Sequence, residues 1–323
     1  MSVDVKKRWA GESVERRAPV AAFVDALSEL MEGDDRVVTL IGDQSARVGL
    51  GELGEQYSDR FFHGGSAQQN LIGMAAGLAS MGKVAVVVTA ASSIAGAAPL
   101  LNIVVAQTGL HVVLAALPSG LAGCEGDAGH TLIDLGVLGA VPGLRVLAPT
   151  DAEETAKALI TLVDEPGPGY LRLSSEPLPQ ITGPDTPFDL GHPLELREGG
   201  ALTLCASGPL VYEALVAADL LEDQGIEVRV LAVHSFNPFE PAAYVKAAEE
   251  TGALLVVEEH AAHGGIGAAV ARVTSSNHPV AIGHLHTGHA FCGAATAQTL
   301  RKSLGLDAES IASAAQNLLA RKG

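Results

Sequence analysis

The sequence is short of positive charge. Its 323 residues carry 20 Lys and Arg against 37 Asp and Glu, which gives a formal net charge of -17 at pH 7. No basic stripe interrupts this acidic background. Because duplex nucleic acids and anionic membrane surfaces repel an acidic protein, the composition argues against binding to either of them.

Cysteine is also scarce. The three cysteines, Cys124, Cys205 and Cys292, lie far apart and form no Cys-x-x-Cys pair, which is typical of a reducing compartment. Residues 1–17 contain no apolar core of signal-peptide length. The longest apolar region, 99–118, is interrupted by Asn, Gln and His, and this indicates a helix followed by a strand rather than a membrane span. We therefore expect a cytoplasmic protein.

Apolar residues make up 48% of the chain and charged residues 18%, which is typical of a globular protein of roughly two domains. Short β-branched runs alternate with helix-length segments, and this pattern predicts an α/β fold. We expect two doubly wound domains, 18–178 and 200–323, each a largely parallel sheet flanked by helices. A linker at 179–199 joins them. A polar arm at 1–17 is expected to be flexible or to lie over a partner.

The chain is organised around residues 61–82, FFHGGSAQQNLIGMAAGLASMG. Ser66 and Gln69 have the spacing of a capping box, and apolar residues follow at helical spacing. The segment thus predicts a helix that ends at Gly82, followed by a buried strand at 84–88. Polar side chains would occupy the first turn of a helix whose start faces a cleft. An ordinary strand–helix–strand junction is the alternative.

This stretch resembles the pyrimidine-binding segment of transketolase-like thiamine diphosphate enzymes, which runs Gly-Ile-Ala-Glu-Gln-Asn. Here residues 65–70 read Gly-Ser-Ala-Gln-Gln-Asn. In the family, the Glu hydrogen-bonds the aminopyrimidine ring of the cofactor and shuttles the proton that activates it. The resemblance implies that Gln68 contacts the aminopyrimidine in its place, and that Gln69 and Asn70 order the site.

Two more candidate residues follow predicted strands. Asp43 comes after the strand at 37–41, and Ser93 comes after the strand at 84–88. Open α/β sheets bind their ligands at the carboxyl ends of the strands. With the resemblance, this position places Asp43 and Ser93 in the expected cofactor-binding set.

The loop at 123–131, GCEGDAGHT, follows another predicted strand. So many glycines indicate unusual backbone angles or a close approach to another group, although a solvent-exposed loop is the alternative. In the transketolase family the corresponding loop reads Gly-x-Asp-Gly-x-Thr-His, and its histidine lies near the substrate. The resemblance implies that His130, one position late, contacts the substrate and that Glu125 is a further catalytic candidate.

The resemblance runs from about residue 18 to the C-terminus. Residues 145–151, RVLAPTD, match a family strand that ends in Pro-x-Asp, and residues 256–260, VVEEH, match a motif of the family's C-terminal domain. The chain is similar to the pyrimidine-binding and C-terminal domains of transketolase, deoxyxylulose phosphate synthase and the pyruvate dehydrogenase beta subunit. The glycines at 264–267 fit no dinucleotide fingerprint, and we interpret them as allowing a helix to start close to a strand. No metal site is expected.

Two family features are missing from the sequence. The first is the Gly-Asp-Gly and Asn-Asn motif that holds the diphosphate and magnesium on another domain. The resemblance therefore implies a split enzyme, in which a partner subunit with the diphosphate-binding domain binds most of the thiamine diphosphate and Mg²⁺. It also implies a homodimer of this chain within a heterotetramer, and a chain that is inactive alone.

The second missing feature is chemical. The family's Thr-Phe-x-x-Phe pattern, with a ring that stacks on the pyrimidine, is replaced by small and aliphatic residues. A glutamine forms hydrogen bonds but carries no proton to transfer. Loss of general acid–base help costs roughly 100-fold to 10,000-fold in rate. Asp43, Glu125 and His130 are the nearby ionisable candidates that would substitute.

Three functions are compatible with these observations. The leading one is a subunit of a two-component transketolase-like enzyme that transfers a ketol or acyl fragment from a sugar phosphate or a 2-keto acid to an acceptor. The second is a non-catalytic structural or regulatory subunit. The third is altered chemistry on the same fold without thiamine, because a fold does not determine a function.

Overall fold

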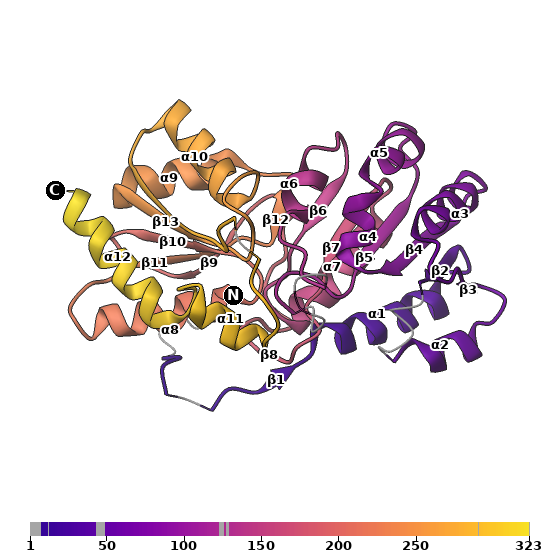
Figure 1. Ribbon diagram of the computed structural model, residues 1–323, viewed down its shortest axis with the longest axis horizontal. Coiled ribbons are helices and arrows are strands. Elements are labelled where there is room, and N and C mark those ends of the chain that lie inside the picture. The colour runs from indigo at the N-terminus through magenta and orange to yellow at the C-terminus, as the bar shows by residue number, and fades with distance from the viewer. Residues whose placement is uncertain are drawn as a thin grey trace.

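The computed structural model describes residues 8–11, 13–42, 49–122, 126, 129–289 and 291–322. Two helix-flanked sheets lie side by side (Figure 1). We call the part built around the seven-stranded sheet the N-terminal lobe and the part built around the five-stranded sheet the C-terminal lobe. The predicted α/β class, with two largely parallel sheets, is confirmed.

The sheet of the N-terminal lobe has the strand order β12-β6-β7-β5-β4-β2-β3. Its neighbouring strands are parallel except for the antiparallel pair β12 and β6. The strands are β2 (Val37–Ile41), β3 (Phe61–His63), β4 (Val84–Thr89), β5 (Val112–Ala116), β6 (Arg145–Leu147), β7 (Gly169–Arg172) and β12 (Ser235–Asn237).

Helices cover both faces of this sheet because its central strands are apolar on both sides. In β4, Val86 packs with one set of helices and Val87 with the other. One face carries α1 (Pro19–Gly33), α2 (Leu50–Gln56) and α7 (Ala152–Asp164). The other carries α3 (Gln68–Ser80), α4 (Ala91–Gly96), α5 (Ala98–Leu101), the π-helical turn η2 (Asn102–Ala106) and α6 (Asp134–Gly139).

The sheet of the C-terminal lobe has the order β14-β13-β10-β11-β9, with only the edge strand β9 antiparallel to its neighbour. Its strands are β9 (Leu194–Arg197), β10 (Thr203–Ala206), β11 (Arg229–Ala232), β13 (Ala253–Val257) and β14 (Ala281–Leu285). Helices α8 (Leu210–Glu222) and α12 (Ala308–Lys322) pack on one face, and α9 (Pro241–Thr251) and α10 (Ile266–Asn277) on the other. The short helix α11 (Ala297–Ser303) precedes α12.

The two lobes share one hydrophobic core. A single cluster of buried side chains includes Val87 and Leu138 of the N-terminal lobe and Val256 and Tyr244 of the C-terminal lobe. Strand β12 follows β11 of the second sheet along the chain, but it crosses over and pairs with β6 of the first sheet. The lobes are therefore interlocked as well as packed together.

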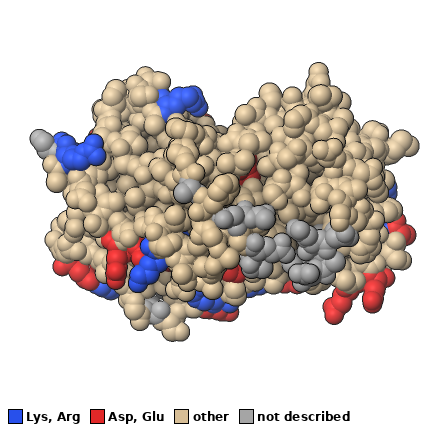
Figure 2. Space-filling model, in the orientation of Figure 1, with Lys and Arg blue, Asp and Glu red and all other residues tan. Residues whose placement is uncertain are grey.

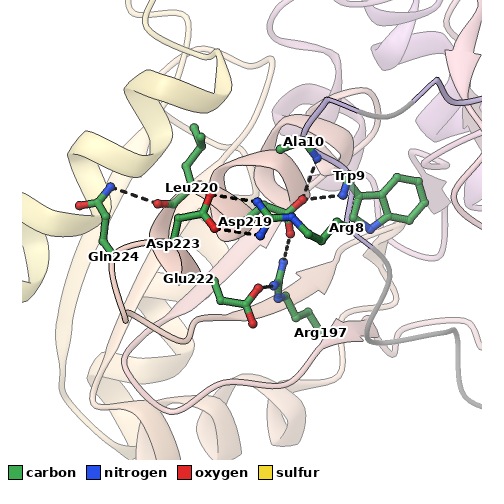
Figure 3. A network of polar contacts seen from close by, with 9 residues as sticks. All are labelled: Arg8, Trp9, Ala10, Arg197, Asp219, Leu220, Glu222, Asp223 and Gln224. Carbon is green, nitrogen blue, oxygen red and sulfur yellow. Dashed lines mark hydrogen bonds and ion pairs between the residues drawn. The ribbon is translucent and has the colours of Figure 1, made fainter.

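The N-terminal segment also joins the two lobes. Trp9 is buried, and its N–H and that of Ala10 donate to Asp219 of α8 at 2.5 and 2.8 Å (Figure 3). Strand β1 (Arg16–Arg17) then pairs with β8 (Leu178–Pro179) just before α1 begins in the other lobe. We expected an arm that is flexible or lies over a partner; the described residues of the arm instead lie on the chain itself.

Glycines flank helix α3 at both of its ends. Ala67 occupies the N-cap position where the sequence predicted Ser66. The predicted capping box is therefore wrong. A Cβ on Gly64 would lie 2.2 Å from a methyl group of Leu71, so only glycine lets this turn fold back on the helix. The predicted end of the helix at Gly82, which has a φ of 85°, is confirmed. Among the described residues, no helix combines the length and apolarity needed to cross a bilayer.

Candidate active site

The candidate site residues that the structure describes follow strands at one edge of the N-terminal sheet, where the parallel strands β2, β3, β4 and β5 end. Gly42, directly after β2, is a point of close contact. A Cβ there would lie 2.9 Å from Thr89 Oγ1 and 3.5 Å from the carbonyl oxygen of Gly65. The ends of three strands therefore converge beside the turn that leads into α3.

The first turn of α3 is polar and uncharged. Gln68 begins the helix and is half-buried, whereas Gln69 and Asn70 are exposed. The Asn70 amide donates to the sulfur of Met74 at 3.4 Å. Asp43, the predicted neighbour from the loop after β2, lies outside the described residues, as does Glu125. Neutral amides are thus the polar groups that this turn presents.

A cavity of about 460 Å³ opens next to the same edge, between the two lobes. Its polar lining consists of Ser92, His130, Thr131, Thr287, His289 and Cys292. Leu132, Ile133 and Phe291 supply much of its apolar wall. The structure thus brings His130 to a cavity, and among the described residues the other candidates, Gln68, Gln69, Asn70 and Ser93, do not line it. On α4, Ser92 lines the cavity in place of the predicted Ser93.

The segment that carries His130 is closed at its base. Gly120 and Thr131 form an antiparallel bridge, with the Thr131 N–H donating to the Gly120 carbonyl at 3.2 Å. Ser119 Oγ donates to the Leu173 carbonyl at 2.6 Å, which ties the start of the segment to the end of β7. The His130 N–H donates to the Gly126 carbonyl at 3.1 Å. These bonds hold His130 over the end of the sheet.

Buried ion pairs lie beneath this segment. The guanidinium of Arg172, on β7, donates to Asp134 at 2.8 Å and to the Thr131 carbonyl at 3.1 Å. Tyr170 donates to the same carboxylate at 2.6 Å, and burial and this carboxylate raise the pKa of Tyr170. Glu259 is buried, which opposes its charge, but Arg301 and Arg172 lower its pKa below the ordinary value. Glu259 is therefore ionised and is neutralised by the two guanidinium groups beside it.

The motif at 256–260 connects β13 to the N-terminal lobe. Nε2 of His260 accepts from the Gly136 N–H at 3.1 Å, and Nδ1 lies 2.9 Å from the Ala261 carbonyl. Since Nε2 accepts, Nδ1 is the nitrogen that donates to this carbonyl. The Ala261 N–H donates to the Leu132 carbonyl at 2.7 Å. This contact places the C-terminal lobe directly against the cavity wall.

Glu258 explains the glycines that follow. Its carboxylate accepts from the N–H groups of Ile266 and Gly267 at 2.7 and 2.8 Å, and so caps α10. A Cβ on Gly265 would lie 2.2 Å from that carboxylate. The interpretation of these glycines as allowing a helix to start close to a strand is confirmed. In the described part of the chain, no group of three or more His, Cys, Asp or Glu could hold a metal ion.

The contribution of the C-terminal lobe to the cavity was not predicted from the sequence. Thr287, His289, Phe291 and Cys292 follow β14, the edge strand of the second sheet. Ligands bind at the carboxyl ends of strands in open α/β sheets, which is the principle that selected Asp43 and Ser93, and the polar residues after β14 fit it as well. The principle does not predict that this end of β14 faces the other lobe.

Comparisons with known proteins agree with this architecture. Residues 17–180 match the family described as transketolase, pyrimidine binding domain, and residues 191–311 match transketolase, C-terminal domain. The chain is 34% identical over 303 residues to the 6-deoxy-6-sulfo-D-fructose transketolase subunit SqwH of Clostridium sp. (strain MSTE9), covering 93% of this chain and 94% of that protein. It is 36% identical over 259 residues to one of the subunits of the apulose-4-phosphate transketolase of Phocaeicola vulgatus, covering 79% and 83%.

Solved structures show the same relationship. A structure described as a split gene transketolase, inactive beta4 tetramer, superposes with a TM-score of 0.85 at 32% identity and covers 95% of this chain and 99% of that one. The transketolase of Pichia stipitis shares the fold, with a TM-score of 0.80 at 18% identity, but this chain spans 47% of its length. 1-Deoxy-D-xylulose-5-phosphate synthase of Syntrophotalea carbinolica is 31% identical over 47% of its own length.

The chain belongs to the transketolase family, whose thiamine diphosphate-dependent enzymes transfer ketol groups. Within the family it is the subunit of a split transketolase that carries the pyrimidine-binding and C-terminal domains, and thus one component of a two-subunit transferase. The predicted resemblance is confirmed. A subunit of this type implies a partner chain that completes the enzyme.

Proposed function

We propose that this chain forms the pyrimidine side and the substrate side of the active site of a split transketolase, while the partner holds the diphosphate and Mg²⁺. The observation that carries this proposal is the convergence at one sheet edge of the amide-lined start of α3 and the cavity that contains His130. The partner is required because the Gly-Asp-Gly and Asn-Asn motif is absent from the sequence. The chain alone is therefore inactive.

The residues at the start of α3 fit an aminopyrimidine ring. A primary amide both donates and accepts hydrogen bonds, so half-buried Gln68 would hold a ring nitrogen and an exocyclic amine. Gln69, Asn70, Asp43 and Ser93 would complete the contacts. When bound, thiamine diphosphate supplies the thiazolium carbon that accepts the ketol group. Gln68 orients the ring but transfers no proton, so proton transfer must come from ionisable groups at the site or from the cofactor's own amine.

The cavity fits the polar end of a ketose or of a 2-keto acid. His130 and His289 offer imidazole nitrogens, and Ser92, Thr131 and Thr287 carry hydroxyl groups. Such groups bind substrate hydroxyl and carbonyl oxygens, and the apolar wall excludes water from them. In this proposal His130 contacts the substrate, and Glu125 is a further candidate for proton transfer.

The proposed subunit interface is the face formed by α3, α4, α5 and η2. Lys83 is the only Lys, Arg, Asp or Glu between Phe61 and Cys124, in a chain of net charge -17. Figure 2 shows the region over α3, α4 and α5 almost without charged residues, while acidic and basic residues gather along the opposite edge. Met81 and Ile103 are 83% and 61% exposed. A charge-poor surface with exposed apolar side chains is suited to subunit burial, and supports a homodimer within a heterotetramer.

Reconstitution tests the proposal. The chain is combined with a partner that carries the Gly-Asp-Gly motif, and thiamine diphosphate binding and ketol transfer are measured with Mg²⁺. Donors to test include 6-deoxy-6-sulfo-D-fructose, apulose 4-phosphate and a 2-keto acid. We expect binding and transfer by the pair only, and a loss of roughly 100-fold or more in kcat/KM for His130→Ala. Failure of the pair to bind thiamine diphosphate would refute the proposal and favour altered chemistry without thiamine.

The presence of Gln68 in place of a carboxylate favours one competing function, a regulatory subunit that stabilises its partner without touching the reaction. In that case the partner would keep its activity when paired with Gln68→Ala or His130→Ala. A strong loss with both variants at unchanged complex stability would exclude the regulatory function.

A further inference from the structure

The closed base of the segment that carries His130 is held from the C-terminal lobe. Glu259, at the end of β13, accepts the Leu121 N–H through Oε2 at 3.1 Å. Its backbone carbonyl accepts from Nη2 of Arg172 at 3.0 Å, and the same nitrogen donates to the Thr131 carbonyl at 3.1 Å. Both ends of the segment, at Leu121 and Thr131, are therefore connected to one residue of the other lobe.

Gly120 makes this contact possible. Its φ is 59°, and a Cβ there would lie 2.4 Å from Oε2 of Glu259 and 3.3 Å from Nη2 of Arg172. Only glycine combines this left-handed backbone with the close approach of a carboxylate. A larger residue at position 120 would therefore displace the carboxylate of Glu259.

Arg301 of α11 keeps the carboxylate in place. Its Nε donates to Oε1 of Glu259 at 2.5 Å, and its Nη2 donates to Glu176. Glu259 is 3% exposed and Arg301 7%. A planar guanidinium donates hydrogen bonds at fixed angles, so when it binds two carboxylates it fixes their orientation more strongly than the ammonium group of a lysine would. The orientation of Glu259 therefore depends on Arg301.

We propose that Glu259, held by Arg301, is a positioning residue for His130. This inference rests on the proposed contact between His130 and the substrate. Glu259 touches neither substrate nor cofactor. It acts through the Leu121 N–H, which its carboxylate accepts, and through Arg172, which donates to the carbonyls of both Glu259 and Thr131. The C-terminal lobe thereby sets the geometry of a side chain that belongs to the N-terminal lobe.

Two pairs of variants separate positioning from general stability. Arg301→Lys is matched by Arg197→Lys, because Arg197 also bridges two carboxylates, buried Asp219 and exposed Glu222 (Figure 3), and does not line the cavity. Gly120→Ala is matched by Gly225→Ala. Gly225 has a φ of 77°, and the methyl group of an alanine there would meet no neighbour within 4 Å. Each control carries the same chemical change without the contact to Glu259.

Amide hydrogen exchange is measured on the full chain in complex with its partner, with kcat/KM and thiamine diphosphate affinity measured alongside. We expect Arg301→Lys and Gly120→Ala to speed exchange at Leu121 and Thr131 by about tenfold, and the controls to leave it unchanged. We expect kcat/KM to fall by about tenfold to a hundredfold in these two variants, since small misplacements at an active site have effects of that size, with cofactor affinity unchanged.

A double-mutant cycle completes the test. In a His130→Ala background, Arg301→Lys should cause no further loss of kcat/KM, since the side chain that it positions is already gone. The same fold loss in both backgrounds would overturn the proposal, as would unchanged exchange at Leu121. A wild-type kcat/KM for His130→Ala alone would refute the substrate contact, and with it the positioning role, whatever exchange shows.

Discussion

At the scale of the residue, we propose that the amide of Gln68 sets the chemistry that this subunit contributes. Gln68 begins α3 at the converging strand ends, at the position where the family resemblance implies a glutamate. A carboxylate takes up and releases a proton near neutral pH when its environment raises its pKa, whereas an amide does neither. Proton transfer at the aminopyrimidine must therefore come from other groups.

The variant Gln68→Glu tests this reasoning. We expect exchange of the thiazolium C2 proton in the reconstituted pair to rise by roughly 100-fold to 10,000-fold, the usual contribution of a general acid–base group. Exchange is followed by NMR in D₂O. Gln56→Glu, the same chemical change at an exposed residue at the end of α2, serves as the control and should change the rate little. No gain with Gln68→Glu would mean that another group already activates the cofactor.

At the scale of the element, carboxylates cap the starts of two helices, and one of them also binds the segment between the lobes. Glu258 caps α10 and Asp151 caps α7. Asp151 also accepts the N–H groups of Ile181 and Thr182, at 2.8 and 2.6 Å, from the segment that leads toward the C-terminal lobe. The Pro-x-Asp motif found in the sequence is therefore a joint between a helix and the interlobe segment.

Asp151→Ala should consequently cost more than loss of a simple cap. Removing the carboxylate leaves the buried Ile181 and Thr182 N–H groups without their acceptor, so we expect about 3 to 5 kcal/mol of destabilisation. Thr296→Ala removes a local cap that accepts only from Thr299, and should cost about 1 kcal/mol. Urea unfolding of both variants gives the comparison. Equal losses would show that the interlobe bonds contribute nothing.

At the scale of the whole molecule, the shared core, β12 in the first sheet and the N-terminal segment on α8 help to hold the lobes together. A buried pair between His234 and Glu154, at 3.0 Å, is a further connection. Burial disfavours a charged His234, but the Glu154 carboxylate raises its pKa above the ordinary value. The same pairing lowers the pKa of Glu154 against the effect of burial.

This pair makes stability depend on pH. Because the folded state raises the pKa of His234, its contribution is fully present below the unfolded pKa of about 6.5 and is lost as pH rises through the raised value. Because the pKa of Glu154 is lowered, its contribution is lost only in acid. We expect the free energy of unfolding of the wild type to fall as the pH rises above about 6.5 and through the raised pKa of His234.

The variant Glu154→Gln should abolish that slope and cost about 3 kcal/mol at pH 6.5, since it leaves His234 buried without its counter-charge. Glu153→Gln is the control on the same helix. It removes a pair with Lys157 at 3.7 Å and should cost less than about 1 kcal/mol. Denaturant unfolding across this pH range distinguishes the two. A wild-type slope in Glu154→Gln would assign the pH dependence to another group.

The sequence predicted local structure well wherever a short pattern decides it. The apolar run of β4, the end of α3 at Gly82 and the close start of α10 after β13 were all predicted, and the motif at 65–70 indicated the family. These features depend on neighbours along the chain: side-chain periodicity, glycine conformations and motif spacing. The incorrect capping box shows the limit, because the contact of Gly64 with Leu71, not the Ser-x-x-Gln spacing, determines where α3 begins.

Only the tertiary structure decided which distant segments meet. Nothing near Ser235 in the sequence places it beside Leu147, nothing near Trp9 indicates Asp219, and nothing near His130 indicates Glu259. Thr287 and His289 join the cavity because β14 ends beside the other lobe. Such pairings depend on long-range packing that buries apolar surface and matches charges across the fold, and a pattern read along one segment contains no information about its partner. The sequence by itself thus determined the family and the uncharged side chain at position 68, and the packing of the lobes determined how the segment that carries His130 is held.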